Sequence, residues 1–153
     1  MKYTRLTKEQ LEELSFEFAR FLAAQQIDTA EWHRLKKEHP SVAEDEIDVF
    51  SDMVWEKSLS KVEYLQRFDR QLVSVVKIDI GKMYMRSVVI SRPMIDLTTT
   101  EGLQWLDENF YLPEVQLYTG EKKFEKERNV EIFELIRQGY HISDGGYYER
   151  LKF

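Results

Sequence analysis

The chain of 153 residues contains no cysteine. Disulfide bonds, thiolate nucleophiles and cysteine-ligated zinc sites are therefore excluded, and an oxidising compartment is not indicated. Residues 1–6 contain no apolar run of signal-peptide length, and no later stretch approaches the ~20 apolar residues that cross a bilayer. The sequence thus predicts a cytoplasmic protein that is not secreted by a standard signal and does not span a membrane.

Common catalytic motifs are also missing. The six glycines form neither a G-x-G-x-x-G nor a G-x-x-x-x-G-K-[ST] loop, and no serine lies in G-x-S-x-G. His33 and His39 lie on or beside a charged helix, where surface positions are expected, and no histidines form a ligand pair such as H-E-x-x-H. His141 precedes Asp144 by three residues, so the two could form an acid–base pair. This spacing is the one observation that supports such a pair.

Three capping boxes predict three N-terminal helices. In each, a Thr, Asp or Ser precedes a Gln or Glu by three residues, and apolar residues follow at helical spacing. The helices are expected at residues 7–25, from residue 28 to just before Pro40, and from residue 41 to about 57, with a less certain continuation to 68.

A β-hairpin is predicted next, because Val-rich and Ile-rich runs at 72–80 and 83–90 flank a turn at Gly81-Lys82. The helices come first and most strands later, which favours an α+β domain over a doubly wound sheet. We therefore expect a single domain, 1–153, in which N-terminal helices pack with a small antiparallel sheet built around the central hairpin. Further elements are predicted at 97–110 (helix), 115–118 (short strand) and 129–138 (helix), whereas residues 140–153 could form a small hairpin or a last helical turn.

Charge is distributed unevenly along this acidic chain, whose net charge is −6. Residues 1–60 carry eight Lys/Arg against thirteen Asp/Glu, and residues 93–153 carry seven against twelve. Residues 61–92 have the opposite sign, with seven basic groups against three acids.

The basic residues of the hairpin are the candidate binding site. Alternate residues of a strand share one face, so charges that are spread out in sequence can gather there. Such a patch suits a phosphate backbone or an acidic protein surface, and a tyrosine among the cations could stack on a base. Alternatively, the cations pair with the protein's own acids. The candidate residues are Lys77, Lys82, Tyr84, Arg86 and Arg92.

An acidic stripe of Glu44, Asp48 and Asp52 is predicted on the third helix, because these residues lie four apart. The stripe could hold a hard cation, but acids near a helix N-terminus and on a solvated face also need no ligand. The mixed charges of residues 122–128 indicate a solvated helix start or loop. The tryptophans are expected in the core or at its edge rather than in a ligand cage; they are Trp32, Trp55 and Trp105.

Four stretches resemble an uncharacterised family of small Bacteroidota proteins, and the resemblance covers nearly the whole chain. They are MKYTRLT (1–7), DVFSDMVWE (48–56), IDLTTTEG (95–102) and IFELIRQG (132–139). The resemblance implies no activity and no catalytic residue. Small lineage-restricted proteins of this kind are associated with the large ribosomal subunit, although the acidic pI differs from that of most ribosomal proteins.

We therefore expect a non-enzymatic interaction module that docks on a larger cytoplasmic protein or ribonucleoprotein assembly, such as the ribosome, through the basic hairpin. The alternative is a carboxylate-based metal-dependent enzyme or metal-binding protein, with His141 as its base. A homodimer through a sheet edge is a third alternative. No cofactor, metal ligand or catalytic residue is assigned from the sequence.

Overall fold

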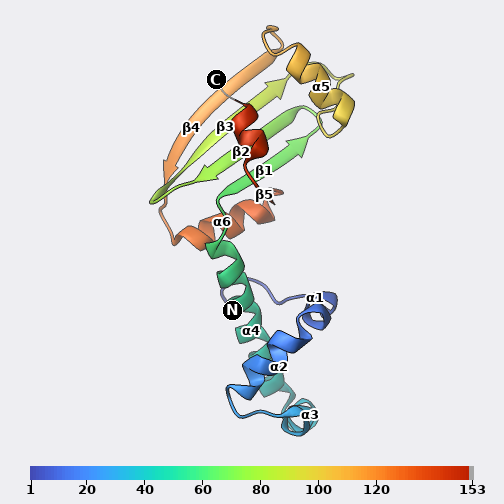
Figure 1. Ribbon diagram of the computed structural model, residues 1–153, viewed down its shortest axis with the longest axis vertical. Helices are drawn as coiled ribbons and strands as arrows, with labels where there is room; N and C mark the ends of the chain where they lie inside the picture. The colour runs from blue at the N-terminus through green and yellow to red at the C-terminus, as the bar shows by residue number, and fades with distance from the viewer. Residues whose placement is uncertain (152–153) are drawn as a thin grey trace. The chain divides into compact units, whose positions relative to one another are not determined.

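The structure is a computed structural model, and it describes residues 1–151 (Figure 1). It contains helices and one antiparallel sheet, with helices both before and after the strands in sequence, which confirms the predicted α+β class. Backbone contacts divide the chain into two compact units, residues 1–60 and the residues from 61 onward. We describe each unit by itself, and the single domain stays a prediction.

The N-terminal unit contains four helices, and its first two predicted caps are confirmed. Thr7 and Gln10 form a capping box, and the Asp28 carboxylate accepts the backbone N–H of Glu31 at 2.8 Å. The predicted helix 7–25 is divided, because Leu14 leaves the helical region with φ −101° and ψ 21°. The helices are α1 (Lys8–Glu13), α2 (Ser15–Ala23), α3 (Thr29–Glu38) and α4 (Pro40–Ser60).

Helix α4 begins at Pro40, so the predicted cap at Ser41 is wrong. Proline suits the first helical turn because its missing N–H has no partner to lose there. The ring of Phe50 on this helix lies 4.9 Å from that of Phe18 and 5.3 Å from that of Phe21, and Trp32 contacts Phe18 edge-on at 5.2 Å. This aromatic cluster forms the core of the N-terminal unit.

The C-terminal unit is built on a five-stranded sheet with the order β4-β3-β2-β1-β5, and every neighbouring pair is antiparallel. The predicted hairpin is confirmed as β2 and β3, and Gly81 takes φ +76° in its turn. The strands are β1 (Tyr64–Asp69), β2 (Leu72–Ile78), β3 (Lys82–Ile90), β4 (Val115–Lys123) and β5 (His141–Ser143); the helices are α5 (Thr100–Glu108), α6 (Arg128–Arg137) and α7 (Gly146–Arg150).

Two strands of this unit differ from the sequence prediction. Strand β1 lies where a helical continuation to residue 68 was expected, and β4 continues five residues beyond the predicted end at Tyr118. Of the two alternatives predicted for residues 140–153, the helical turn is confirmed as α7, and β5 before it pairs with β1. The pairings of β4 with β3 and of β5 with β1 join residues distant in the chain, which local periodicity does not reveal.

The two faces of the sheet are covered by different helices. On one face, which we call the α7 face, Val73, Val75 and Val88 pack with Leu106 of α5 and Tyr148 of α7. The ribbon of α7 lies across this face in Figure 1. The other face, which we call the α6 face, is joined to the end of α6 by a hydrogen bond of 2.8 Å between the hydroxyls of Ser74 and Tyr140.

A buried carboxylate fixes the connection between β4 and α6. Only 3% of the Glu131 side chain is exposed. Its Oε1 accepts a hydrogen bond from Lys122 Nζ at 2.9 Å, and its Oε2 accepts the backbone N–H groups of Glu125 and Lys126 at 2.9 and 3.3 Å. Burial alone raises the pKa of Glu131, but these hydrogen bonds and the charge of Lys122 outweigh it and hold the pKa below its ordinary value of 4.5.

The substitution Glu131→Gln is expected to lower the free energy of unfolding by about 1–3 kcal/mol at neutral pH, because buried N–H donors lose their charged acceptor. Since the folded-state pKa is depressed, this stabilisation is present above the unfolded-state pKa and is lost as the pH falls through the folded-state pKa. Urea unfolding of both proteins across the acidic range measures the difference, which should shrink with acidification.

Glu134→Gln is the matched control, since Glu134 on the same helix forms an exposed ion pair with Lys126 at 2.7 Å. Its loss should stay below about 1 kcal/mol. Equal losses for the two variants would contradict the role assigned to Glu131.

Candidate functional site

The structure brings four of the five predicted binding residues to one face of the sheet. Lys77 lies opposite Tyr84 in the β2–β3 register, and Lys82 and Arg86 lie two residues to either side of Tyr84. All four are half-buried on the α7 face, near the end of β3 that follows the turn. A fourth cation here is Lys123, which lies opposite Lys82 on β4.

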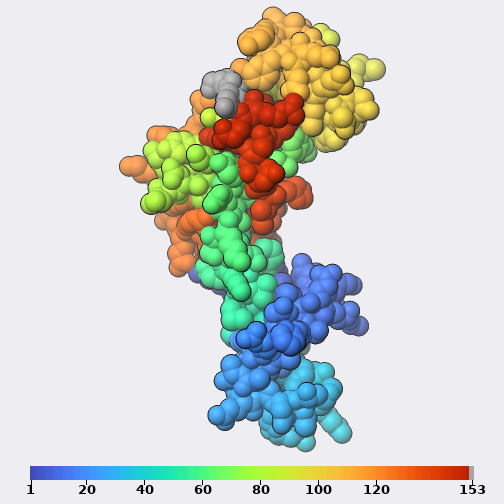
Figure 2. Space-filling view, in the orientation of Figure 1, coloured from blue at the N-terminus to red at the C-terminus, as the bar shows by residue number. Residues whose placement is uncertain are grey.

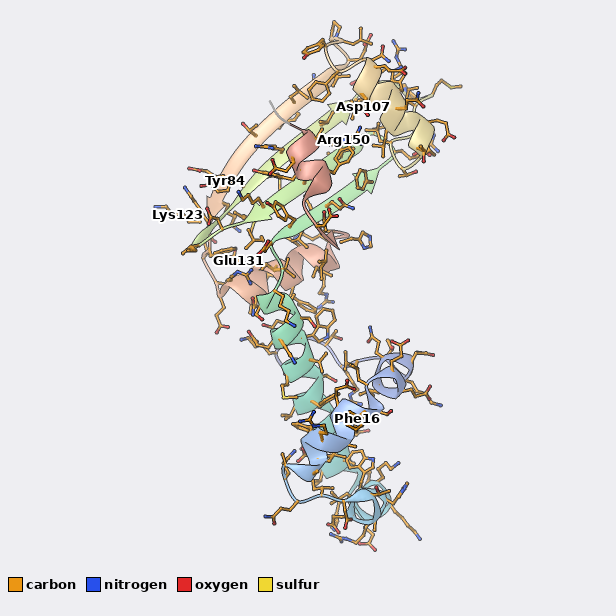
Figure 3. All side chains as sticks on the ribbon, viewed as in Figure 1. Phe16, Tyr84, Asp107, Lys123, Glu131 and Arg150 are labelled. Carbon is orange, nitrogen blue, oxygen red and sulfur yellow. The ribbon has the colours of Figure 1, made fainter. Side chains whose placement is uncertain are left out.

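We call Lys77, Lys82, Arg86 and Lys123 the basic corner. Strands lie about 4.8 Å apart and rise about 3.3 Å per residue, so the four Cα atoms span about 10 by 13 Å. Figure 3 shows Tyr84 and Lys123 at this end of the sheet. Two acids lie beside them: Glu121, opposite Tyr84 on β4, and Asp79, whose backbone N–H donates to the Lys82 carbonyl at 2.9 Å across the turn.

Lys82 has the closest contacts of the three lysines. Its Nζ lies 3.4 Å from Glu121 Oε2 and 5.0 Å from the centre of the Tyr84 ring. The hydrogen bond with Tyr84 and the charge of Glu121 raise the pKa of Lys82. None of the ion pairs among the described residues involves Lys77 or Lys123, so one carboxylate balances only part of the corner's charge.

Arg86 contributes to both the fold and the charge. Its Nη1 donates to the Tyr148 carbonyl at 2.7 Å, and its guanidinium lies 4.0 Å from the centre of the Tyr148 ring. Neither contact neutralises the cation, because a carbonyl and a ring carry no formal charge. Arg86 therefore holds α7 against the sheet while it keeps its positive charge.

Two of the predicted binding residues, Tyr84 and Arg92, have surroundings that differ from the expected ones. Tyr84 packs against the hydrophobic core and beneath Lys82, so its ring is not presented for stacking on a base. Arg92 lies beyond the other end of β3, ten residues from Lys82 and thus about 30 Å along the strand direction. There it pairs with Glu114 at 3.7 Å and lies over the ring of Trp105. The structure does not bring Arg92 to the corner.

Lys123 was missed by the sequence prediction. Residues 122–128 were expected to be a helix start or loop, whereas β4 includes residues up to Lys123. The run from Val115 to Lys123 has no regular alternation of apolar and polar residues, and all but its first residue are exposed. Its pairing with β3 would have been the signal that placed Lys123 beside Lys82.

The acidic stripe binds the N-terminal segment of its own unit. The Asp52 carboxylate accepts the backbone N–H groups of Lys2 and Tyr3 at 2.7 and 2.9 Å, and Arg5 Nε donates to Asp48 at 2.6 Å. The Arg5 guanidinium lowers the pKa of Asp48. Two of the stretches that carry the family resemblance, 1–7 and 48–56, therefore meet through these contacts.

The other candidate residues have ordinary surroundings. His141 is exposed on β5, and the Asp144 carboxylate accepts the backbone N–H of Gly146 at 2.8 Å. The three tryptophans are half-buried, which agrees with the edge of a core. Within residues 1–151, no group of three or more His, Asp or Glu side chains is arranged to hold a metal ion, and no helix is long and apolar enough to cross a membrane.

The fold and the corner define an α+β protein with a positively charged sheet surface on an acidic chain. The chain belongs to DUF6495, a family of unknown function, whose model matches residues 1–153. No curated protein and no solved structure matches the chain.

Asp52→Ala is expected to lower the free energy of unfolding by about 1–3 kcal/mol, because two backbone donors lose a charged acceptor. The amides of Lys2 and Tyr3 should also exchange with deuterium faster, which NMR or mass spectrometry measures. Asp45→Ala on the same exposed side of α4 is the control and should change stability by less than about 0.5 kcal/mol. If Asp52→Ala leaves deuterium exchange at both amides unchanged, Asp52 does not hold the N-terminal segment in the way described.

Proposed function

We propose that this protein is a non-enzymatic interaction module that docks on a larger cytoplasmic assembly, the ribosome in particular, through the basic corner. The observation that supports the proposal is the convergence of Lys77, Lys82, Arg86 and Lys123 on one sheet face, with Glu121 and Asp79 as the acids beside them. The whole chain, with these cations included, has a net charge of −6. The corner is therefore a local positive surface on an acidic chain, which suits a polyanion.

Phosphate is the partner chemistry that this arrangement favours. Lysine ammonium groups bind phosphate as point charges and release condensed counterions when they do so. At physiological salt, screening weakens electrostatic interactions beyond about 8 Å. A phosphate near the corner therefore interacts mainly with the local cations and less with the net charge of the whole molecule. The acidic remainder would repel a phosphate backbone and so restrict the docking orientation.

The two kinds of cation in the corner have different roles in this proposal. Lys77 and Lys123 supply charge without the structural contacts that Arg86 makes with Tyr148. Lys82 forms an ion pair with Glu121 at 3.4 Å. The pair is exposed to solvent, so a competing phosphate can replace the carboxylate. Docking should therefore depend most on the three lysines.

The acidic stripe favours no second function, because Asp48 and Asp52 bind residues of the N-terminal segment. A carboxylate-based metal-dependent protein stays the alternative prediction from the sequence. A thermal-shift screen with divalent cations tests it directly, since a ligand that binds the folded state raises the melting temperature.

Reversing Lys77, Lys82 and Lys123 together to Glu is expected to abolish co-sedimentation with purified ribosomes at physiological salt. Each phosphate contact that is lost should reduce the slope of log affinity against log salt by about one. Sedimentation at several salt concentrations measures both effects. The fold should persist, because all three lysines are at least partly exposed.

Arg70→Glu is the matched control, because Arg70 is exposed at the opposite end of the sheet, in the β1–β2 turn. It should co-sediment like the unaltered protein. If the triple variant binds as tightly as the control, or if the unaltered protein does not bind ribosomes at low salt, the proposed function is wrong. Binding that survives nuclease digestion of the RNA would instead identify an acidic protein surface as the partner.

A further inference from the structure

Strand β4 forms an edge of the sheet whose outer side is exposed. Its residues from Gln116 to Lys123 are all exposed, and among residues 1–151 its one strand neighbour is β3. Figure 2 shows this strand and the segments around it on the molecular surface. A nine-residue edge is long enough to template pairing with another strand.

The register shows which backbone groups of β4 point outward. At one end the Ser91 N–H donates to the Glu114 carbonyl, and at the other the Phe124 N–H donates to the Gly81 carbonyl, both at 3.1 Å. Residues alternate along an antiparallel strand, so the even-numbered residues between these bonds face β3. The outward N–H and C=O groups belong to Leu117, Thr119, Glu121 and Lys123, together with the C=O of Val115, whose N–H donates to the Leu112 carbonyl at 3.0 Å.

We propose that β4 pairs antiparallel with β4 of a second copy, about a two-fold axis that passes between the two Thr119 residues. In this register Thr119 faces Thr119 and Leu117 faces Glu121 with both outward groups paired, and Val115 faces Lys123, whose N–H can donate to the Val115 carbonyl. If the two-fold axis passed through Tyr118 or Gly120 instead, one end of the strand would have no partner in the second copy. The two sheets would join into one continuous sheet.

Side chains on the α6 face support this register. Gly120 lies on β4 in ordinary strand conformation, and a Cβ added to it would meet no atom within 4 Å. Glycine weakens a strand, and it often marks a place where another group approaches closely. In the Thr119-centred register Gly120 faces Tyr118 of the second copy, whose exposed fraction is 53% in the isolated chain.

A cavity lies beside Gly120 to receive that ring. It has a volume of about 240 Å³ and lies between the α6 face and α6. Its apolar lining comes from Met83, Met85 and Leu135. Its polar and charged lining residues are Glu121, Lys122, Glu131, Glu134 and Gln138, so the ring would lie on the methionines with its hydroxyl near polar groups. An aromatic ring opposite an edge glycine covers exposed backbone, and methionine adapts well to an inserted ring.

The position of Tyr118 agrees with this insertion. Its hydroxyl donates to Gln116 Oε1 at 2.9 Å, so the ring leans along β4 toward Gln116. In the proposed register Gln116 faces Lys122 of the second copy, and Lys122 also lines the cavity. The ring therefore lies along β4 at the level of the facing chain's cavity, and insertion requires it to turn across the strand pair.

Charge favours a second copy of this chain as the occupant. With Thr119 on the axis, Glu121 faces Leu117, Lys123 faces Val115 and Lys122 faces Gln116, so no like charges lie opposite each other. The pairing also covers Leu117 and Tyr118, whose exposed fractions are 39% and 53%. Like charges directly opposite destabilise a strand pair, and apolar or aromatic pairs stabilise it.

The absence of cysteine makes a cross-linking test direct. In the proposed register, Thr119→Cys places two thiols on the axis, where paired Cα atoms are about 5.5 Å apart and can form a disulfide. The full-length variant should form a covalent dimer under mild oxidation. Gln116→Cys is the control on the same exposed strand, and its two copies would lie six residues apart, beyond disulfide reach.

Sedimentation equilibrium of the unaltered chain should show a dimer, and Tyr118→Ala should raise the dimer dissociation constant about tenfold or more. A monomer up to millimolar concentration would overturn the proposal, as would cross-linking at Gln116→Cys that is as fast as at Thr119→Cys. Equal dimerisation by Tyr118→Ala would overturn the cavity insertion. The dimer does not rest on ribosome docking, and changing Lys77 and Lys82 alone to Glu separates the two, because this variant alters the basic corner without altering β4. It should lose ribosome binding and still dimerise.

Discussion

The strict two-residue alternation of side chains along β3 and β4 is the constraint on which the surface of this protein depends. The two strands keep one register over their full length, from Lys82 opposite Lys123 to Ile90 opposite Val115. A shift of β4 by one residue would move Lys123 to the α6 face and turn the outward N–H groups of β4 inward. The buried Glu131 carboxylate holds Lys122 and the turn after β4, and so secures the end of this register.

The basic corner and the β4 edge are therefore related by geometry. Antiparallel pairing at an edge places the two-fold axis perpendicular to the sheet, so both copies would present the α7 face on the same side. Lys123 of one copy would lie beside Val115 of the other, and the two Lys123 residues would be about 26 Å apart along the strands. Two weak phosphate contacts at a fixed spacing bind far more tightly than one alone.

Local signals in the sequence predicted the elements that local interactions form. The caps at Thr7 and Asp28 and the turn at Gly81 each depend on residues three or four apart, and all three are confirmed. Strand β1 was missed because pairing with other strands stabilises it. Its partners are β2, which follows it directly, and β5, which lies far along the chain. The extension of β4 to Lys123 was missed for the same reason.

The amino-acid sequence by itself determined the α+β class, the positive sign of the central segment and the hairpin that carries most of the candidate site. Only the tertiary structure decided that Lys123 joins this site, that Arg92 does not, and that Asp48 and Asp52 bind the N-terminal segment. The physical reason is the range of the interactions. Caps, turns and alternation act between near neighbours, whereas strand order and ion pairing are set by residues that meet only after the chain has folded.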